Sequence, residues 1–131
     1  MHSVTTAQTA AAKAKPPARS RALAWAERQR GKWYCYGGSG PRCFDCSGLV
    51  MSAYRHAGIN LPRTTYEMLR SKLLRRIPAN KRKPGDLAFY GSGHVELVTP
   101  HYTFGALHTG TRIGYHRPNR WWHPTMYFEV R

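Results

Sequence analysis

The sequence predicts one α+β domain in which N-terminal helices pack on an antiparallel β-sheet. With 131 residues, the chain is long enough for one compact domain and too short for two full ones. Apolar residues recur at helical spacing up to about residue 74, and short extended runs follow the turn at Pro84-Gly85. Helices first and strands afterwards is an order typical of α+β domains.

Residues 1–19 are expected to form a flexible basic arm, and residues 20–131 to form the folded domain. The arm is rich in Ala, Thr and Lys, so it has little apolar surface to offset the conformational entropy lost on folding. It also lacks the apolar stretch of a signal peptide. Either a signal has been removed or export uses another route.

The first helix is expected from Ser20, as its N-cap, to about Arg30, with Gly31 ending it. Residues 33–36 are short, aromatic and typical of a strand. Residues 37–41, with three glycines and a proline, indicate a loop.

The second helix has the clearest pattern. Apolar side chains recur every three or four residues from Cys46 to about Ala57, Asp45 stands at the N-cap position, and Gly58 stands where a C′ glycine belongs. This pattern places Cys46 in the first helical turn, on the side that faces the core. A shorter helix is expected from Thr64 to about Leu74.

The second half of the chain predicts a sheet. Five extended segments, rich in aromatic and β-branched residues, are separated by turn residues. They are residues 86–90, 95–99, 103–108, 112–116 and 125–130.

The net charge narrows the choice of partners. Lys and Arg number 21 against 6 Asp and Glu, which gives a formal charge of +15. Such a field attracts anionic wall polymers, lipid or nucleic acid, although it also suits a merely soluble surface. No nucleic-acid motif is present, and no run of about 18 apolar residues predicts a transmembrane helix. The charge alone does not choose among these anionic partners.

The three cysteines, Cys35, Cys43 and Cys46, lie close together in the sequence. An odd number suggests one disulfide and one free thiol, as in an oxidising compartment. The C-x-x-C spacing of Cys43 and Cys46 also fits half of a zinc site. No second C-x-x-C or H-x-x-x-H follows, so no metal and no cofactor is expected.

Cys46 and His94 are the candidate nucleophile and base. A thiol attacks as a thiolate, and both the start of a helix and a neighbouring imidazolium favour that form. His94 opens a strand after the glycine loop 91–93, which holds it on a rigid element. The alternatives are a small buried residue for Cys46 and a structural histidine for His94.

A third group has to accept a hydrogen bond from the far nitrogen of His94. His108 is the leading candidate, because it ends a strand expected to pair with that of His94. Glu96 shares a strand face with His94. Side chains two residues apart on a strand are separated by about 7 Å, which makes a direct contact less easy.

The segment 44–50, F-D-C-S-G-L-V, resembles the nucleophile motif of NlpC/P60 cysteine peptidases. Four more segments resemble the family's in the same order, and together they cover about residues 23–117. They are Y-C-Y-G-G at 34–38, G-I-N-L-P-R-T at 58–64, K-P-G-D-L at 83–87 and G-H-V at 93–95.

The resemblance implies a papain-like α+β fold and a Cys-His-His triad of Cys46, His94 and His108. It also implies hydrolysis of peptidoglycan stem peptides, at the bond between D-glutamate and the diamino acid, through an acyl-enzyme. The protein would then be secreted or associated with the cell wall, and we expect a monomer. The positions that match the family's substrate pocket are Tyr34, Asp45 and Ser47.

One position departs from the family. Glu96 stands where many members have Gly or Ala, so it is expected to bind a cationic substrate group or to take the third place in the triad. Because the chemistry claims Cys46, Cys35 and Cys43 are expected to form a disulfide. The alternative functions are an amidase, acyltransferase or transglutaminase with the same fold, or a non-catalytic basic module that binds the wall.

Overall fold

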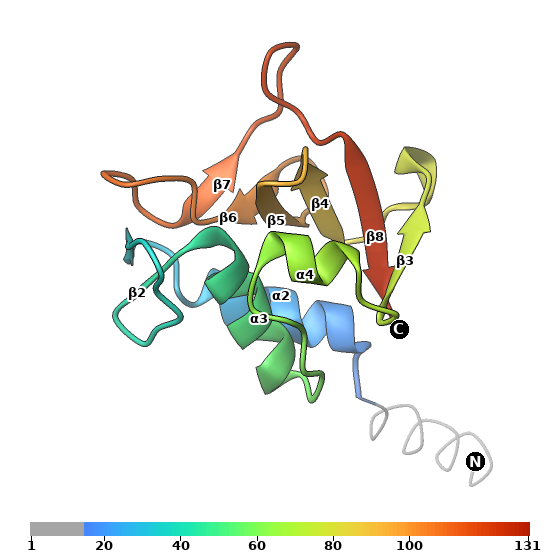
Figure 1. The fold of residues 1–131 in the computed structure, drawn as a ribbon, viewed down its shortest axis with the longest axis horizontal. Helices are drawn as coiled ribbons and strands as arrows, with labels where there is room; N and C mark the ends of the chain where they lie inside the picture. The colour runs from blue at the N-terminus through green and yellow to red at the C-terminus, as the bar shows by residue number, and fades with distance from the viewer. Residues whose placement is uncertain (1–14) are drawn as a thin grey trace, which may run out of the picture.

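The computed structural model describes residues 15–131, in which the helices come mainly first and the strands last (Figure 1). The helices are α2 (Ala18–Glu27), α3 (Cys46–His56), α4 (Thr65–Leu69) and the 3₁₀ helix η1 (Ala79–Lys81). The strands are β1 (Trp33–Tyr34), β2 (Cys43–Phe44), β3 (Leu74–Ile77), β4 (Leu87–Tyr90), β5 (His94–Val98), β6 (Thr103–Gly105), β7 (Gly114–His116) and β8 (Met126–Val130). The predicted α+β class is confirmed.

Six strands form one antiparallel sheet in the order β3-β8-β4-β5-β6-β7. All five predicted extended segments contribute a strand, although β6 and β7 are shorter than expected. The edge strand β3 was missed: the helix expected from Thr64 to about Leu74 ends at Leu69, and no strand was expected at residues 74–77. They pair instead with β8, Leu74 opposite Val130, and this tertiary pairing outweighs the local helical pattern.

The helices differ in how well the sequence predicted their ends. α2 begins at Ala18, after Pro17 at the N-cap position, so the prediction that Ser20 is the cap is wrong. α3 begins at Cys46 as predicted, and the Asp45 carboxylate accepts a hydrogen bond of 2.6 Å from the Gly48 N–H. The expected arm lies mostly outside the described residues, and α2 already includes its last two positions.

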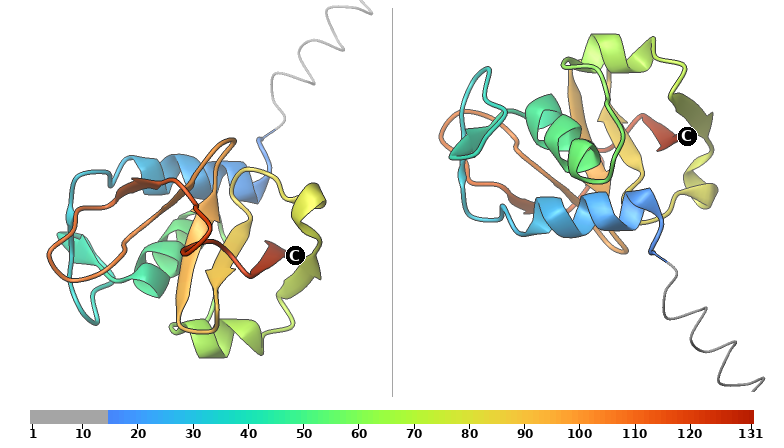
Figure 2. Two further views of the ribbon diagram at one scale, coloured as in Figure 1. Left: turned by 90° about the horizontal axis from the view of Figure 1, so that it is seen from above. Right: turned by 90° about the horizontal axis from the view of Figure 1, so that it is seen from below.

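The core is a single cluster between helices α2 and α3 and the sheet. Figures 1 and 2 show these two helices on one side of the sheet, with the long β7–β8 connection projecting from the other side. Alternate strand residues point into the cluster, whereas His94 and Glu96 lie on the opposite face of β5. The fully buried strand residues of the core are Leu87, Phe89, Val95, Leu97 and Phe104.

A disulfide between Cys35 and Cys43 closes the glycine loop beside α3, as predicted, and Cys46 is a free thiol. The loop packs directly on the first turn of the helix. A Cβ atom on Gly48 would lie 2.0 Å from the Gly38 carbonyl oxygen, so no larger residue fits there without movement. The same carbonyl accepts a hydrogen bond of 2.8 Å from the Asp45 N–H.

We expect the double variant Cys35→Ser/Cys43→Ser to lower the free energy of unfolding by about 2–3 kcal/mol, because a ring of this size restricts the unfolded chain by that amount. Urea denaturation of the oxidised protein and the variant measures the difference. A thiol titration of the native protein should count one reactive sulfhydryl. Equal urea midpoints for the two proteins would contradict a stabilising role for the bridge.

Candidate active site

The candidate nucleophile, Cys46, lies at the first position of α3 and is partly buried against the core. At this end of a helix the free N–H groups and the macrodipole favour negative charge. The Tyr34 hydroxyl has a raised pKa, first because of burial and then because of the negative charges of Cys46 and Asp45. The effect of these two charges places Tyr34 close to the start of α3. The start of α3 therefore suits a thiolate.

His94 is the first residue of β5, and its side chain is only 10% exposed. Burial alone would lower the pKa of its imidazole. Hydrogen bonds to the Cys46 thiol and to the Glu96 carboxylate outweigh burial and raise that pKa to about 9. The imidazole is therefore protonated at neutral pH, and a protonated imidazole is the partner that favours a thiolate.

Glu96 holds the far side of the imidazole. One carboxylate oxygen lies 2.7 Å from His94 Nε2, and the other lies 2.8 Å from His116 Nδ1. The side chain is fully buried, which by itself would raise the pKa of the carboxyl, but the hydrogen bonds from His116 and His94 lower it below its usual value. Glu96 is thus an ionised acceptor between two histidines and is not available to a cationic substrate group.

His108 is not placed as the resemblance implied. Strand β6 ends at Gly105, so His108 falls in the turn that leads to β7 and is exposed. Its Nδ1 donates to the Thr109 carbonyl, and the turn is closed by hydrogen bonds with Thr111. The geometry joins His94 to Glu96 instead, because the two side chains lean together across the strand spacing that seemed too long.

The predicted pocket residues Asp45 and Ser47 are joined by Arg63. The Arg63 guanidinium spans both oxygens of the Asp45 carboxylate, at 3.0 and 2.8 Å, and also donates to Ser47 Oγ at 3.0 Å. It further contacts the Gly38 carbonyl at 3.2 Å. The Asp45 charge is therefore already compensated, and a substrate amine has to compete with Arg63 for it.

Two residues of this region, Arg63 and His116, were missed by the sequence analysis. Arg63 belongs to the segment 58–64. It is the one cation in that segment, and the nucleophile motif contains the acid Asp45, so an ion pair between the two could have been proposed from the sequence. His116 had no local signal, since its partner is distant in sequence. Trp122 stacks on Tyr90 with ring centroids 4.5 Å apart and lies 5.5 Å from the His94 ring, which makes the β7–β8 connection a wall of the site.

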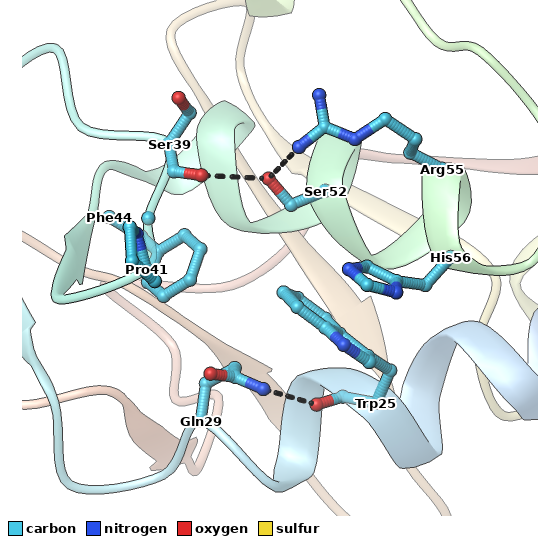
Figure 3. Close-up of a pocket in the computed structure, with 9 residues that line it drawn as sticks. Trp25, Gln29, Ser39, Pro41, Phe44, Ser52, Arg55 and His56 are labelled. Carbon is cyan, nitrogen blue, oxygen red and sulfur yellow. Dashed lines mark hydrogen bonds between the residues drawn. The ribbon is translucent and has the colours of Figure 1, made fainter.

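A separate pocket of about 290 Å³ lies between α2 and α3 (Figure 3). Figure 3 shows the Trp25 and His56 rings stacked at its edge, with centroids 4.3 Å apart, and Arg55 hydrogen-bonded to Ser52. None of the predicted catalytic residues lines it. His56 is a packing residue, stacked on Trp25.

Within residues 15–131 no group of three or more His, Cys, Asp or Glu side chains is arranged to hold a metal ion. Over the same residues no helix has the length and apolarity to cross a membrane.

The NlpC/P60 family matches residues 31–127 of this chain, which is most of its length. The chain belongs to the NlpC/P60 family. Probable endopeptidase p60 of Listeria monocytogenes is 46% identical over 79 residues, covering 57% of this chain and 16% of that protein. Murein DD-endopeptidase MepH of Escherichia coli is 41% identical over 92 residues, covering 66% of this chain and 34% of that protein. The chain thus spans only a minor part of these relatives.

Solved structures of the family have the same fold. An NLP/P60 protein similar to a lipoprotein from Staphylococcus aureus superposes with a TM-score of 0.76 at 28% identity, over 89% of this chain and 42% of that one. RipD of Mycobacterium tuberculosis, described as a non-catalytic NlpC/P60 domain protein adapted to binding peptidoglycan, superposes with a TM-score of 0.71 at 26% identity. That match covers 89% of this chain and 98% of RipD.

The raised pKa of His94 predicts a pH-dependent stability. The pKa is about 6.5 in the unfolded chain and about 9 in the folded one, so the protonated imidazole adds stability that is complete below pH 6.5. This contribution is lost as the pH rises through about 9. Urea unfolding at a series of pH values should show the decline, and His94→Gln should flatten it. An equally steep decline in that variant would assign the effect to other groups.

Proposed function

We propose that this chain is a cysteine peptidase that hydrolyses peptidoglycan stem peptides. The observation that carries the proposal is the free thiol of Cys46 at a helix start, close enough to His94 that the thiol and Glu96 together raise the pKa of this buried imidazole to about 9. A thiol in this setting is poised for nucleophilic attack. The named activities of the relatives supply the class of substrate, since both relatives described above are endopeptidases by name.

The reaction follows from the positions of the two side chains. The Cys46 thiolate attacks the carbonyl carbon of an amide, and the carbonyl oxygen gains negative charge that N–H groups at the start of α3 stabilise. His94 gives its proton to the leaving amine as the C–N bond breaks, which leaves a thioester on Cys46. Water then attacks the thioester while His94 takes its proton, and the thiol and the acid product are released.

The substrate pocket is proposed to lie around Tyr34, Asp45 and Ser47, beside Cys46. Asp45 is the acidic group nearest the nucleophile, and it suits the amine of a short stem peptide provided that Arg63 shifts or shares the carboxylate. We propose cleavage between D-glutamate and the diamino acid. The name of the Escherichia coli relative indicates a DD-endopeptidase, so the bond itself has to be measured.

A binding module without catalysis is the second candidate, because RipD shows that this fold also occurs without activity. Two features of this chain favour the enzyme. Cys46 and His94 are both present with the thiol contributing to the raised pKa of the imidazole, and Glu96 accepts a hydrogen bond from the other side of the ring. A pure binder has no need of this arrangement.

The compartment is proposed from the disulfide and the substrate class. A bridge between Cys35 and Cys43 persists in oxidising surroundings such as the cell exterior. Wall peptides are found there as well, so we propose a secreted or wall-associated protein that acts as a monomer.

Mass spectrometry of fragments released from purified peptidoglycan tests the activity and identifies the bond. We expect Cys46→Ala and His94→Gln to reduce release by about 10³-fold or more, since both groups take part in bond breaking. His101→Gln, which changes an exposed histidine on the β5–β6 connection, is the matched control and should stay near the parent. Binding to the wall without release by the parent protein would favour the second candidate.

The basic surface is proposed to bind anionic wall polymer and not to take part in the chemical step. Seven exposed cations with no acid among them lie between residues 70 and 83: Arg70, Lys72, Arg75, Arg76, Lys81, Arg82 and Lys83. Exposed charges interact over a Debye length of about 8 Å at physiological salt. Binding through this surface should therefore weaken as salt is added.

We expect the double variant Arg70→Gln/Lys72→Gln to weaken binding to whole walls by severalfold and to leave cleavage of a small soluble stem peptide unchanged. Arg28→Gln/Arg42→Gln removes the same charge from elsewhere on the surface and is the control. Sedimentation with walls over a salt series measures binding. If salt slows cleavage of the soluble peptide as much as it weakens wall binding, the charge acts at the active site.

A further inference from the structure

Glu96 is the most deeply buried charged group that contacts the candidate site. Its side chain is fully buried, and each carboxylate oxygen has an imidazole partner, His94 at 2.7 Å and His116 at 2.8 Å. A buried carboxylate is stable only when hydrogen-bonded to charged or polar partners. The two hydrogen bonds therefore restrict the orientation of the carboxylate as well as that of both imidazole rings.

The contact between Glu96 and His116 bridges strands that are not neighbours. Glu96 lies on β5 and His116 on β7, with β6 between them. Two strand spacings amount to about 10 Å, so the two side chains have to meet above the middle strand.

Gly105 on β6 leaves the space in which they meet. A Cβ atom on Gly105 would lie 2.7 Å from Cγ and 3.0 Å from Cδ of Glu96. Any larger residue at this position would displace the carboxylate, because the atoms in conflict belong to the middle of a buried side chain. Gly105 on β6 thus leaves the space that the long Glu96 side chain on β5 occupies.

The hydrogen bond also selects the form of the His94 ring. Nε2 carries the proton that Glu96 accepts, so Nδ1 is the nitrogen left to exchange a proton with Cys46. With His116 donating to its other oxygen, the carboxylate has little freedom to turn away from His94. The imidazole is held in one orientation by a chain of two bonds.

We propose that Glu96 and His116 act as a pair of positioning residues that orient His94, in the role expected for His108, and that Gly105 makes the arrangement possible. Neither residue touches the reacting atoms. The inference rests on the proposed function for its activity readout, but the state of the His94 ring can be measured without any substrate.

The test combines NMR titration of the His94 ring with cleavage of a soluble stem peptide. Glu96→Gln keeps the size of the side chain and removes its charge, so we expect the pKa of His94 to fall by more than about one unit and kcat to fall by about 10²-fold. Gly105→Ala leaves Glu96 chemically intact but displaces it, and it should change both readouts in the same direction.

His116 provides a graded comparison. His116→Ala removes the donor and should lower kcat by about tenfold, the scale of one charge-assisted hydrogen bond. His116→Asn restores an N–H donor at a similar position and should recover most of the loss. A merely structural role would lower stability in both variants without a change in the pKa of His94.

His108→Ala is the discriminating variant, and it should leave the pKa of His94 unchanged. The proposal is overturned if His108→Ala shifts that pKa as far as Glu96→Gln does, or if Glu96→Gln leaves it unaltered. A protein that releases no stem-peptide fragments yet shows the expected pattern of pKa changes would refute the proposed function and support the positioning pair.

Discussion

The architecture of the site depends on a single buried carboxylate. Burying Glu96 as an anion is unfavourable unless both oxygens are paired, so its side chain requires two donors on the same face of the sheet. His94 supplies one from the same strand and His116 supplies the other from two strands away. The strand order β5-β6-β7, the glycine on β6 and the protonated state of His94 all serve this pairing.

The nucleophile depends on a second constraint, at the start of α3. The Gly38 carbonyl accepts from the Asp45 N–H and from Arg63, and it lies against Gly48 in the first helical turn. The disulfide ties both ends of the loop that carries this carbonyl. The helix start, the N-cap acid and the loop are thus one rigid unit that holds Cys46, and α3 in turn packs on β5, the strand that carries His94. Rigid support on both sides keeps a nucleophile and its base in a fixed relative geometry.

Local signals in the sequence predicted these local units well. Asp45 and Gly58 marked the ends of α3 because capping is decided by neighbouring residues, and the motif around Cys46 followed from the same helix. The end of α4 and the strand β3 were mispredicted for the opposite reason. Residues 74–77 pair with β8, more than fifty positions away, and no local pattern carries that information.

The third group of the site shows the same limit at the level of single side chains. His108 was favoured because a strand to residue 108 would bring it near His94, but β6 ends three residues earlier and the chain turns at His108–Thr111. Glu96 was judged too far from His94 from the spacing of backbone positions alone. The Glu96 and His94 side chains are long enough to meet across this backbone spacing, and a hydrogen bond from His116 holds the carboxylate in that position. His116 lies twenty residues further along the chain, so its part could be recognised only in the structure.

The comparison with RipD shows why such details decide function within this family. One fold serves both hydrolysis and binding, so the sheet and the helices by themselves predict neither. Function has to be argued from the side chains of the site, here the free thiol of Cys46 and the buried imidazole of His94. In this chain Glu96 lies on β5 beside His94, and the neighbouring strand β6 has Gly105 where the acid needs room.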